Sequence, residues 1–361
     1  MSTLVSITTK PDPATIDPHW IHRLPVVVLY PHNQCNCRCV MCDIWRIREA
    51  KQITPADAAQ LLPSLKQLGV RWVVLSGGEP QLNEKWSWLA QMFRSAGSRV
   101  TLLTSGLLLK PQAQAVAENI DDVIVSLDGP PAVHNSIRRI PDAFERMAEG
   151  VRCLHEIRPE MEIRARCTVQ KANHHSLRAV LAYARQIGLT SISFLAADLT
   201  SSAFNRQEGW SSHQRDRVSL NADEVEELEV EIERLIAQEA AKIGPAFVVE
   251  RSEKLRRIVQ HFRAHHQNAP QTAPRCNAPW VSAVIDAHGD VRPCFFHPAF
   301  GNILRQPLTD ILNGPPALDF RANLDIASNE TCRKCVCSLY LSREDEFSAR
   351  TEAWRSSSST A

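Results

Sequence analysis

Short apolar segments alternate with amphipathic ones from residue 26 to residue 195, and this alternation constrains the fold more than any other feature. Strands are predicted at residues 26–30, 71–75, 99–104, 122–126, 162–169 and 191–195. Helices are predicted between them, at residues 54–68, 85–95, 111–118, 143–157 and 177–187. Strands that alternate with helices form βαβ units around a parallel sheet. We therefore expect an α/β fold, a partial (β/α)6 TIM barrel whose site lies at the carboxyl ends of its strands.

The rest of the chain predicts an appendage to this barrel. Residues 200–220 are polar and irregular, as in a loop that covers a site. Two helices are expected at residues 221–243 and 253–266, as solvated bridging elements, and a β-hairpin at residues 281–293. The expected organisation is an N-terminal extension (1–24), the barrel (25–220), bridging helices (221–270), a β-hairpin/helix extension (271–340) and a disordered tail (341–361).

Charge and hydropathy exclude several classes of protein. The 41 basic and 40 acidic residues give a formal net charge of +1, which favours neither nucleic acid nor an anionic membrane as a partner. No signal peptide or transmembrane segment is evident, so we expect a cytoplasmic protein. In that compartment, clustered cysteines bind metal or do redox chemistry more often than they form disulfides.

The eleven cysteines are distributed unevenly, with four between Cys35 and Cys42 and five between Cys276 and Cys337. Cys35, Cys39 and Cys42 have the spacing CxxxCxxC directly after the first predicted strand. Three thiolates on one loop can bind three irons of a [4Fe–4S] cluster and leave the fourth iron open to a ligand. A structural zinc site would instead use four ligands. Cys37 is either a spare buried thiol or an alternative ligand.

Three further motifs follow at successive strand ends: Ser76-Gly77-Gly78-Glu79-Pro80, Thr104-Ser105-Gly106, and Ser126-Leu127-Asp128-Gly129 with His134 and Arg138. With the cysteine spacing, this order resembles the radical S-adenosylmethionine (SAM) superfamily. The resemblance implies a [4Fe–4S] cluster on Cys35, Cys39 and Cys42, with SAM bound to its open iron. It places Gly77, Gly78, Glu79 and Pro80 at the amino group of SAM. It also implies that the backbone of Met41 meets adenine, Ser126 the ribose and Arg138 the carboxylate, with Thr104 in the motif between them.

The second cysteine group resembles the SPASM/twitch extension of that superfamily. Cys276 and Cys294 flank the predicted hairpin, Gly301-Asn302-Ile303 follows it, and Cys332, Cys335 and Cys337 close the set. The resemblance implies one auxiliary [4Fe–4S] cluster on Cys276, Cys294, Cys332 and Cys335. Cys337 is a spare or replaces Cys335, and a structural zinc site is the competing interpretation.

The resemblance implies an enzyme that cleaves SAM reductively to a 5′-deoxyadenosyl radical and abstracts a hydrogen atom from its substrate. We expect a small-molecule substrate that is oxidised or rearranged, and a flavodoxin- or ferredoxin-type electron donor. The alternative is a maturase that modifies a peptide or protein, as in peptide natural products or sulfatases. Only about 25 residues precede the first predicted strand, which disfavours a leader-binding domain. A non-enzymatic iron–sulfur electron carrier or a zinc-stabilised binding module is a remote third hypothesis.

Overall fold

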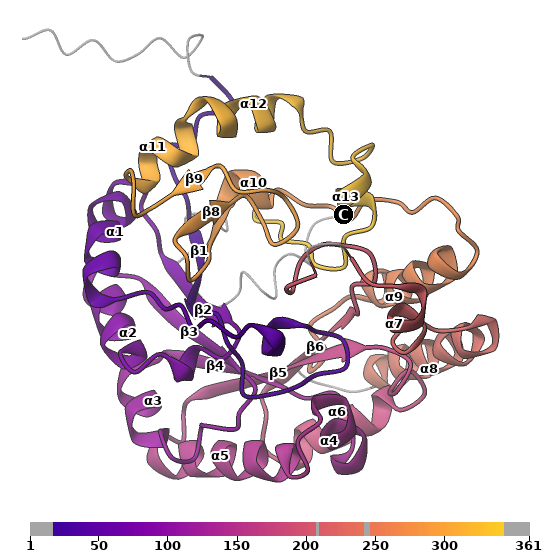
Figure 1. The fold of residues 1–361 in the computed structure, drawn as a ribbon. Coiled ribbons are helices and arrows are strands. Elements are labelled where there is room, and N and C mark those ends of the chain that lie inside the picture. The colour runs from indigo at the N-terminus through magenta and orange to yellow at the C-terminus, as the bar shows by residue number, and fades with distance from the viewer. Residues whose placement is uncertain (1–16, 207–208, 242–245, 343–361) are drawn as a thin grey trace, which may run out of the picture.

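The six strands expected between residues 26 and 196 are present and form one parallel sheet. The protein is seen in a computed structural model, which describes residues 17–206, 209–241 and 246–342. The sheet order is β6-β5-β4-β3-β2-β1, and every neighbouring pair is parallel. The strands are β1 (Val26–His32), β2 (Trp72–Gly77), β3 (Arg99–Thr104), β4 (Asp122–Ser126), β5 (Glu162–Val169) and β6 (Ser191–Ala196). Figure 1 shows the sheet curving inside a ring of helices, which confirms the partial (β/α)6 barrel.

Alternate residues of each strand bury against the outer helices. Val27 and Leu29 of β1 and Val73 and Leu75 of β2 are at most 2% exposed and belong to the main core. Because side chains alternate across a strand, the remaining positions face the inside of the barrel. The covering helices are α1 (Pro55–Gln67), α2 (Trp86–Ser95), α3 (Ala113–Asn119), α4 (Pro131–Arg138), α5 (Ala143–Ile157) and α6 (Leu177–Gln186). Helix α4 was not predicted from the sequence.

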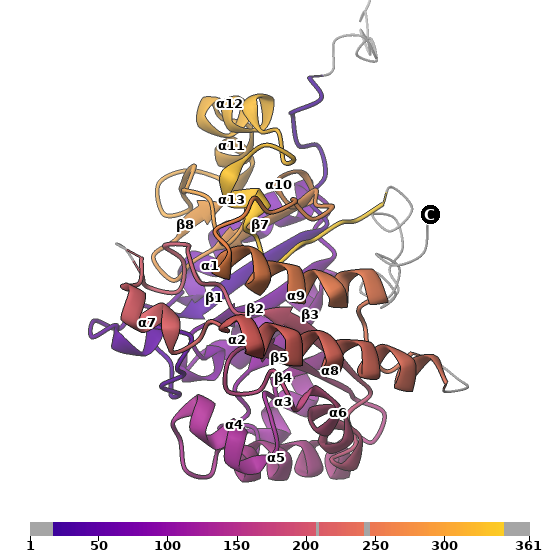
Figure 2. The same cartoon turned by 90° about the vertical axis from the view of Figure 1, so that its right-hand side faces the viewer.

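The two helices after the barrel differ from the expectation of solvated bridging elements. They are α8 (Ala222–Ala240) and α9 (Ser252–His266), preceded by the short α7 (Ser212–Asp216). Leu228 and Leu235 of α8 and Phe262 of α9 are fully buried in the main core. Both helices are amphipathic, so their exposed charged faces resemble solvated helices in composition. Figure 2 shows α8 and α9 side by side against the barrel.

The expected hairpin is present but continues the barrel sheet. Strand β7 (Ser282–Ile285) pairs in parallel with β1, and β8 (Asp290–Arg292) and β9 (Gly301–Asn302) extend the sheet in antiparallel order. The sheet therefore has nine strands among the described residues. The remaining elements are the short helices η2 (Ile44–Arg46), η3 (Pro80–Leu82), α10 (Ala278–Val281), α11 (Leu308–Asn313), α12 (Pro315–Asn323) and α13 (Glu330–Arg333).

Polar and apolar groups fill the amino-terminal end of the barrel. Asp122 of β4 accepts a 2.6 Å bond from Arg99 and also pairs with Arg164. Leu341, expected to begin a disordered tail, is 3% exposed and packs with Val26. Residues 343–361 of that tail and residues 1–16 lie outside the described ranges. With this end filled, a ligand enters from the opposite, carboxyl end of the strands. Within the described ranges, no helix combines the length and apolarity that crossing a membrane requires.

Candidate functional site

The loop after β1, which carries the first four cysteines, is held by the end of helix α4. The N–H groups of Arg38 and Val40 donate to the carbonyl oxygens of Arg138 and Ile137, at 3.0 and 2.9 Å. Carbonyls in the last turn of a helix have no partner within the helix, so they are free to accept these bonds. The helix that the sequence did not predict thus positions the cysteine loop.

The thiols of this loop lie in a buried environment. Burial raises the pKa of Cys42 to about 12, so the free thiol is neutral. A bound iron reverses this preference, because a coordinating thiol is deprotonated by the metal charge. Cys37 is 1% exposed and packs with Leu107 beside Cys39. A hydrogen bond with Cys35 is the main reason that the pKa of Cys37 rises to about 12. These contacts favour the interpretation of Cys37 as a buried thiol.

The two glycines after β2 are required by close contact with the cysteine loop. A Cβ atom on Gly78 would lie 2.0 Å from the carbonyl oxygen of Gln34. Gly77 has φ +107°, and a Cβ atom there would lie 2.8 Å from the side chain of Tyr30. The N–H of Glu79 donates to the same Gln34 carbonyl at 2.8 Å. Only glycine allows this approach of two backbones, which seats the end of β2 directly against the cysteine loop.

The Glu79 carboxylate organises the neighbouring strand ends. It is fully buried, and burial raises its pKa. It accepts hydrogen bonds from the Thr104 hydroxyl at 2.9 Å and from the N–H and hydroxyl of Ser105 at 2.9 and 2.7 Å. Ser105 in turn contacts Asn36 of the cysteine loop at 3.1 Å. This carboxylate therefore joins the ends of β2 and β3 to the cysteine loop.

Arg138 lies between a carboxylate and a cysteine. Its guanidinium donates to Asp128 through Nε at 2.7 Å and through Nη2 at 2.5 Å, and Nη1 lies 3.6 Å from the Cys39 sulfur. Burial opposes the charged form, but Asp128 together with the sulfurs of Cys39 and Cys37 outweighs it, and the pKa of Arg138 is raised. His134 accepts the N–H of Asp128 at 3.1 Å, and burial lowers its pKa to about 4. Arg138 is thus a fixed guanidinium beside the cysteine loop.

The segment after β6 packs onto the same loop. Arg206 donates to the carbonyl oxygen of Met41 and pairs with Asp198 at 2.9 Å. Its guanidinium carbon lies 3.6 Å from the ring centroid of Trp210, whose Nε1 donates to Asp43 at 2.6 Å. Sequence reasoning marked residues 200–220 as a covering loop but did not find Arg206 or Trp210, because no motif surrounds them.

The second group of cysteines comes together from three segments: the stretch before α10 and β7, the stretch after β8, and α13 with the residues that follow it. Burial raises the pKa of Cys294 to about 12 and that of Cys332 to about 11, and in both cases the neighbouring Cys276 contributes. His297, which sequence reasoning also missed, places Nε2 3.4 Å from the Cys332 sulfur. Arg257 of α9 donates to the carbonyl oxygen of Cys335 at 3.0 Å. Across the described ranges, no three His, Cys, Asp or Glu side chains are grouped closely enough for a single metal ion.

Two side chains occupy the barrel interior between the cysteine groups. Burial and the Asp286 carboxylate raise the pKa of Tyr30, and Cys42 and Cys337 both belong to its electrostatic surroundings. Arg166 of β5 lies 3.4 Å from the Ser193 hydroxyl, and burial lowers its pKa despite the nearby Cys337. Ser126 ends β4 and is half-buried. The interior that joins the two cysteine groups is therefore lined by polar and aromatic groups.

The structure brings the residues expected to bind SAM to one end of the barrel. They lie in the loop after β1 and at or just after the carboxyl ends of β2, β3 and β4, and α4 supplies Arg138. These residues are Met41, Gly77, Gly78, Glu79, Pro80, Thr104, Ser126 and Arg138. The residues fit a ligand with a carboxylate and a cysteine-bound cluster, because Arg138 adjoins Cys39 and the Gly77–Gly78 turn packs against the same cysteine loop.

Comparisons with known proteins identify both parts of the chain. A family model described as "Radical SAM superfamily" matches residues 29–170, and SPASM, an "Iron-sulfur cluster-binding domain", matches residues 276–336. The AdoMet-dependent heme synthase of Methanosarcina barkeri is 30% identical over 159 residues, which are 43% of this chain and 45% of that protein. The Pre-heme d1 synthase of Dinoroseobacter shibae is 25% identical over 313 residues, 81% of this chain and 74% of that protein.

The fold is shared with solved structures. SuiB of Streptococcus suis, bound to the precursor peptide SuiA, superposes with a TM-score of 0.62 at 16% identity. The match covers 88% of this chain and 72% of SuiB. The chain spans less than half the length of the first curated relatives it matches, at 45% and 40%. The two matched domains and the shared barrel place the chain in the radical SAM superfamily, with a SPASM-type iron–sulfur domain at its C-terminal end.

Proposed function

We propose that this chain is a radical SAM enzyme that uses SAM and two iron–sulfur clusters to oxidise or rearrange a small biosynthetic molecule. The observation that carries the proposal is the meeting of three features at one end of the barrel. These are the cysteine loop, the Gly77–Gly78 turn packed against it, and the Arg138 guanidinium 3.6 Å from the Cys39 sulfur. Cys35, Cys39 and Cys42 would hold a [4Fe–4S] cluster there, which when reduced would supply the electron for reductive cleavage of SAM.

The chain's own residues bind and orient the cosubstrate. Cys35, Cys39 and Cys42 are the proposed ligands of the cluster. Arg138, held rigid by Asp128, is placed to grip the SAM carboxylate, since a guanidinium suits that partner. Ser126 presents a half-buried hydroxyl for the ribose. The Glu79 carboxylate acts by holding Thr104 and Ser105 in place.

The auxiliary cluster is proposed to bind Cys276, Cys294, Cys332 and Cys335, with Cys337 directed toward the barrel interior. The interior around Tyr30 and Arg166 connects the two cysteine groups, so a substrate held there is within reach of both. The electron that reduces the SAM-binding cluster is proposed to come from a flavodoxin- or ferredoxin-type protein. The enzyme is proposed to act in the cytoplasm, a reducing compartment.

The relatives support a small-molecule substrate, with a peptide as the second candidate. The named heme and pre-heme d1 synthases match by sequence, and the latter match extends over 81% of this chain. The shared fold with SuiB bound to its precursor peptide favours the peptide hypothesis. Incubation of the reconstituted enzyme with a porphyrin tetracarboxylate or with a candidate precursor peptide separates them, because mass spectrometry detects the product of either.

The test of the proposed function is anaerobic reconstitution with iron and sulfide. We expect about eight irons per chain in the wild type and about four in a Cys35/Cys39/Cys42→Ala variant. Only the wild type should form 5′-deoxyadenosine when SAM and dithionite are added. Iron-loaded wild type that forms no 5′-deoxyadenosine would refute the proposal. About four irons in the wild type and none in the variant would show that the chain binds no auxiliary cluster.

A further inference from the structure

A cleft lies at the open edge of the barrel, beside the auxiliary cysteines. Its volume is about 630 Å³, within the range of pockets that bind small molecules. Four segments form its walls: residues 194–196 of β6, residues 249–261 leading into and along α9, residues 272–275, and residues 335–340 after α13. Strand β6 is the last in the sheet order, so the cleft opens where the barrel is not closed by a further strand.

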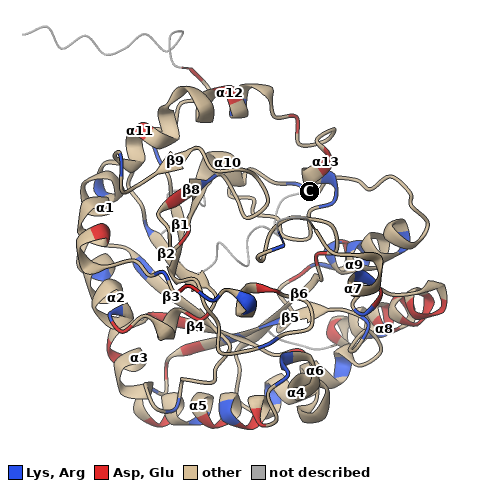
Figure 3. Cartoon of the chain, viewed as in Figure 1, with Lys and Arg blue, Asp and Glu red and all other residues tan. Residues whose placement is uncertain are grey.

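The cleft carries an excess of positive charge. Two carboxylates line it, Glu250 and Glu253, against five cationic side chains, Arg251, Lys254, Arg256, Arg257 and Arg275. Lys254 pairs with Glu250 at 3.6 Å, and Arg256 pairs at 2.6 Å with Glu233 of α8. Figure 3 shows the basic positions of α9 beside the acidic positions of α8.

The other three arginines have no acidic partner among the residues that the structure describes. Arg257 donates to the carbonyl oxygens of Thr272 and Cys335, so its charge is not neutralised by a carboxylate. Arg275 donates to the Tyr340 hydroxyl at 2.6 Å and lies over its ring at 3.7 Å. Arg251 precedes α9 and is exposed. Three unneutralised guanidinium groups on one cleft favour an anionic ligand, because guanidinium binds carboxylate through paired hydrogen bonds.

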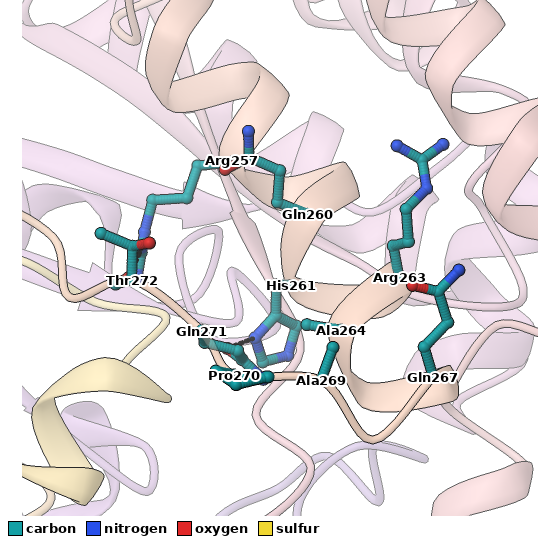
Figure 4. Close-up of a pocket in the computed structure, with 10 residues that line it drawn as sticks. All are labelled: Arg257, Gln260, His261, Arg263, Ala264, Gln267, Ala269, Pro270, Gln271 and Thr272. Carbon is teal, nitrogen blue, oxygen red and sulfur yellow. Dashed lines mark hydrogen bonds between the residues drawn. The ribbon is translucent and has the colours of Figure 1, made fainter.

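The cleft borders the proposed reaction site. Cys335 itself lines it, and the buried Glu250, which also lines it, lies in the electrostatic surroundings of Arg166. A second hollow of about 280 Å³ shares Arg257, Gln260, His261 and Thr272 with it. In Figure 4, Arg257 reaches toward Thr272, and His261 faces Gln271 in the same hollow. The guanidinium of Arg257 therefore borders both hollows.

We propose that this cleft binds the carboxylates of the substrate, a small molecule that bears more than one carboxylate. The proposal rests on the proposed function and names the substrate class of that site. A recessed cavity of ligand size, lined by four chain segments, fits a small molecule better than the flat basic patch that an acidic protein would need. Arg251 and Arg275 anchor separate carboxylates, and the body of the substrate extends past Cys335 toward the barrel interior.

The test uses the reconstituted holoenzyme and coproporphyrin III, a tetracarboxylate, as the probe. Binding is followed by fluorescence quenching in the wild type, in Arg251→Glu and in an Arg251→Glu/Arg275→Gln variant. We expect a dissociation constant roughly tenfold higher for each lost guanidinium contact. Arg152→Glu on α5 makes the same charge change at an exposed position outside the cleft and should bind as the wild type does. The tetramethyl ester of the probe should bind weakly to every variant.

Formation of 5′-deoxyadenosine with dithionite and no substrate separates this proposal from the proposed function. The cleft proposal is wrong if the wild type does not bind the probe. It is also wrong if the cleft variants form 5′-deoxyadenosine as the wild type does and bind the probe with the wild-type dissociation constant. Unchanged probe binding with slower reduction by reduced flavodoxin, but not by dithionite, would instead assign the cleft to the electron donor. If no variant forms 5′-deoxyadenosine, the proposed function itself fails.

Discussion

Arg138 and Asp128 form a buried ion pair that touches the cysteine loop at Cys39. Removal of one partner from a buried pair leaves an uncompensated charge, which costs more than the pair itself contributes. We predict that Asp128→Asn lowers the free energy of unfolding by about 3 kcal/mol and raises the KM for SAM. Urea unfolding and the rate of 5′-deoxyadenosine formation measure the two effects.

The control for this prediction is the same substitution at Asp142, whose pairing with Arg146 spans 3.9 Å on the surface. Exposed pairs contribute at most about 1 kcal/mol, so Asp142→Asn should leave both quantities near the wild-type values. Equal effects at Asp128 and Asp142 would contradict a positioning role for the buried pair.

His297 is expected to tune the auxiliary cluster. Its Nε2 lies 3.4 Å from the Cys332 sulfur, and the ring packs against Phe320. Hydrogen bonds to the sulfurs of an iron–sulfur cluster help to set its reduction potential. His297→Phe keeps a ring but removes the donor, so the midpoint potential should fall, on the order of tens of millivolts.

An EPR-monitored redox titration of the Cys35/Cys39/Cys42→Ala background measures the auxiliary cluster of His297→Phe alone. His288→Phe, an exposed hairpin position, is the matched control. If His297→Phe and that control have the same midpoint potential, a hydrogen bond from His297 does not help to set the potential of the auxiliary cluster.

Residues that act through a motif could be predicted from sequence, and residues that act only through tertiary contact could not. Arg138 belongs to a spaced motif, so it could be named from the resemblance as a residue for the SAM carboxylate. Arg206 and His297 have ordinary neighbours in the sequence. Each reaches the site only because a distant segment folds against it, Arg206 on Met41 and His297 on Cys332.

At the scale of elements, the segment from Asp198 to Trp210 is the most informative. Phe204 and Asn205 have φ of 59° and 64°, a backbone conformation that costs free energy outside glycine. Contacts with the cysteine loop offset that cost. The backbone N–H of Asp43 donates to the Phe204 carbonyl at 3.2 Å, and the side-chain amide of Asn205 donates to the Asp43 carbonyl at 3.1 Å. The segment is therefore held over the loop by its contacts there.

We predict that Trp210→Ala loosens this cover and uncouples SAM cleavage from product formation. The substitution removes the bond to Asp43 and the surface on which Arg206 stacks. Water and solvent donors then reach the radical, so the ratio of 5′-deoxyadenosine to product should rise several-fold. Trp88→Ala, at an exposed position of α2, is the control. An unchanged ratio in Trp210→Ala, with product still formed, would refute the covering role.

Long, periodic elements were predicted more accurately than short ones. The six barrel strands follow from apolar runs, and Thr54 with Asp57 makes the capping box that starts α1. Helix α4 begins at a pair of prolines and has only eight residues, so its sequence does not distinguish it from a turn. The parallel pairing of β7 with β1 joins residues more than 250 positions apart, and no local pattern encodes such a contact.

Over the whole molecule, the C-terminal extension is built onto the barrel rather than linked to it. Strand β7 pairs with β1 along four residues, from Val26 opposite Ser282 to Leu29 opposite Ile285. Helix α11 packs against α1, and the buried Arg321 of α12 donates to the carbonyl oxygen of His19 at 2.6 Å. These contacts are independent of the cysteines, so the extension should keep its fold when the auxiliary cluster is absent.

A Cys276→Ala/Cys294→Ala variant tests this independence. We predict that its iron content falls from about eight to about four per chain, because one of two clusters is lost. SAM cleavage with dithionite should persist, since the first cluster and Arg138 are untouched, whereas product formation should fail. Cys153→Ala, which removes a thiol of α5 outside both groups, should keep about eight irons and full turnover. Loss of 5′-deoxyadenosine formation in the double variant would show instead that the auxiliary site is needed to assemble the barrel site.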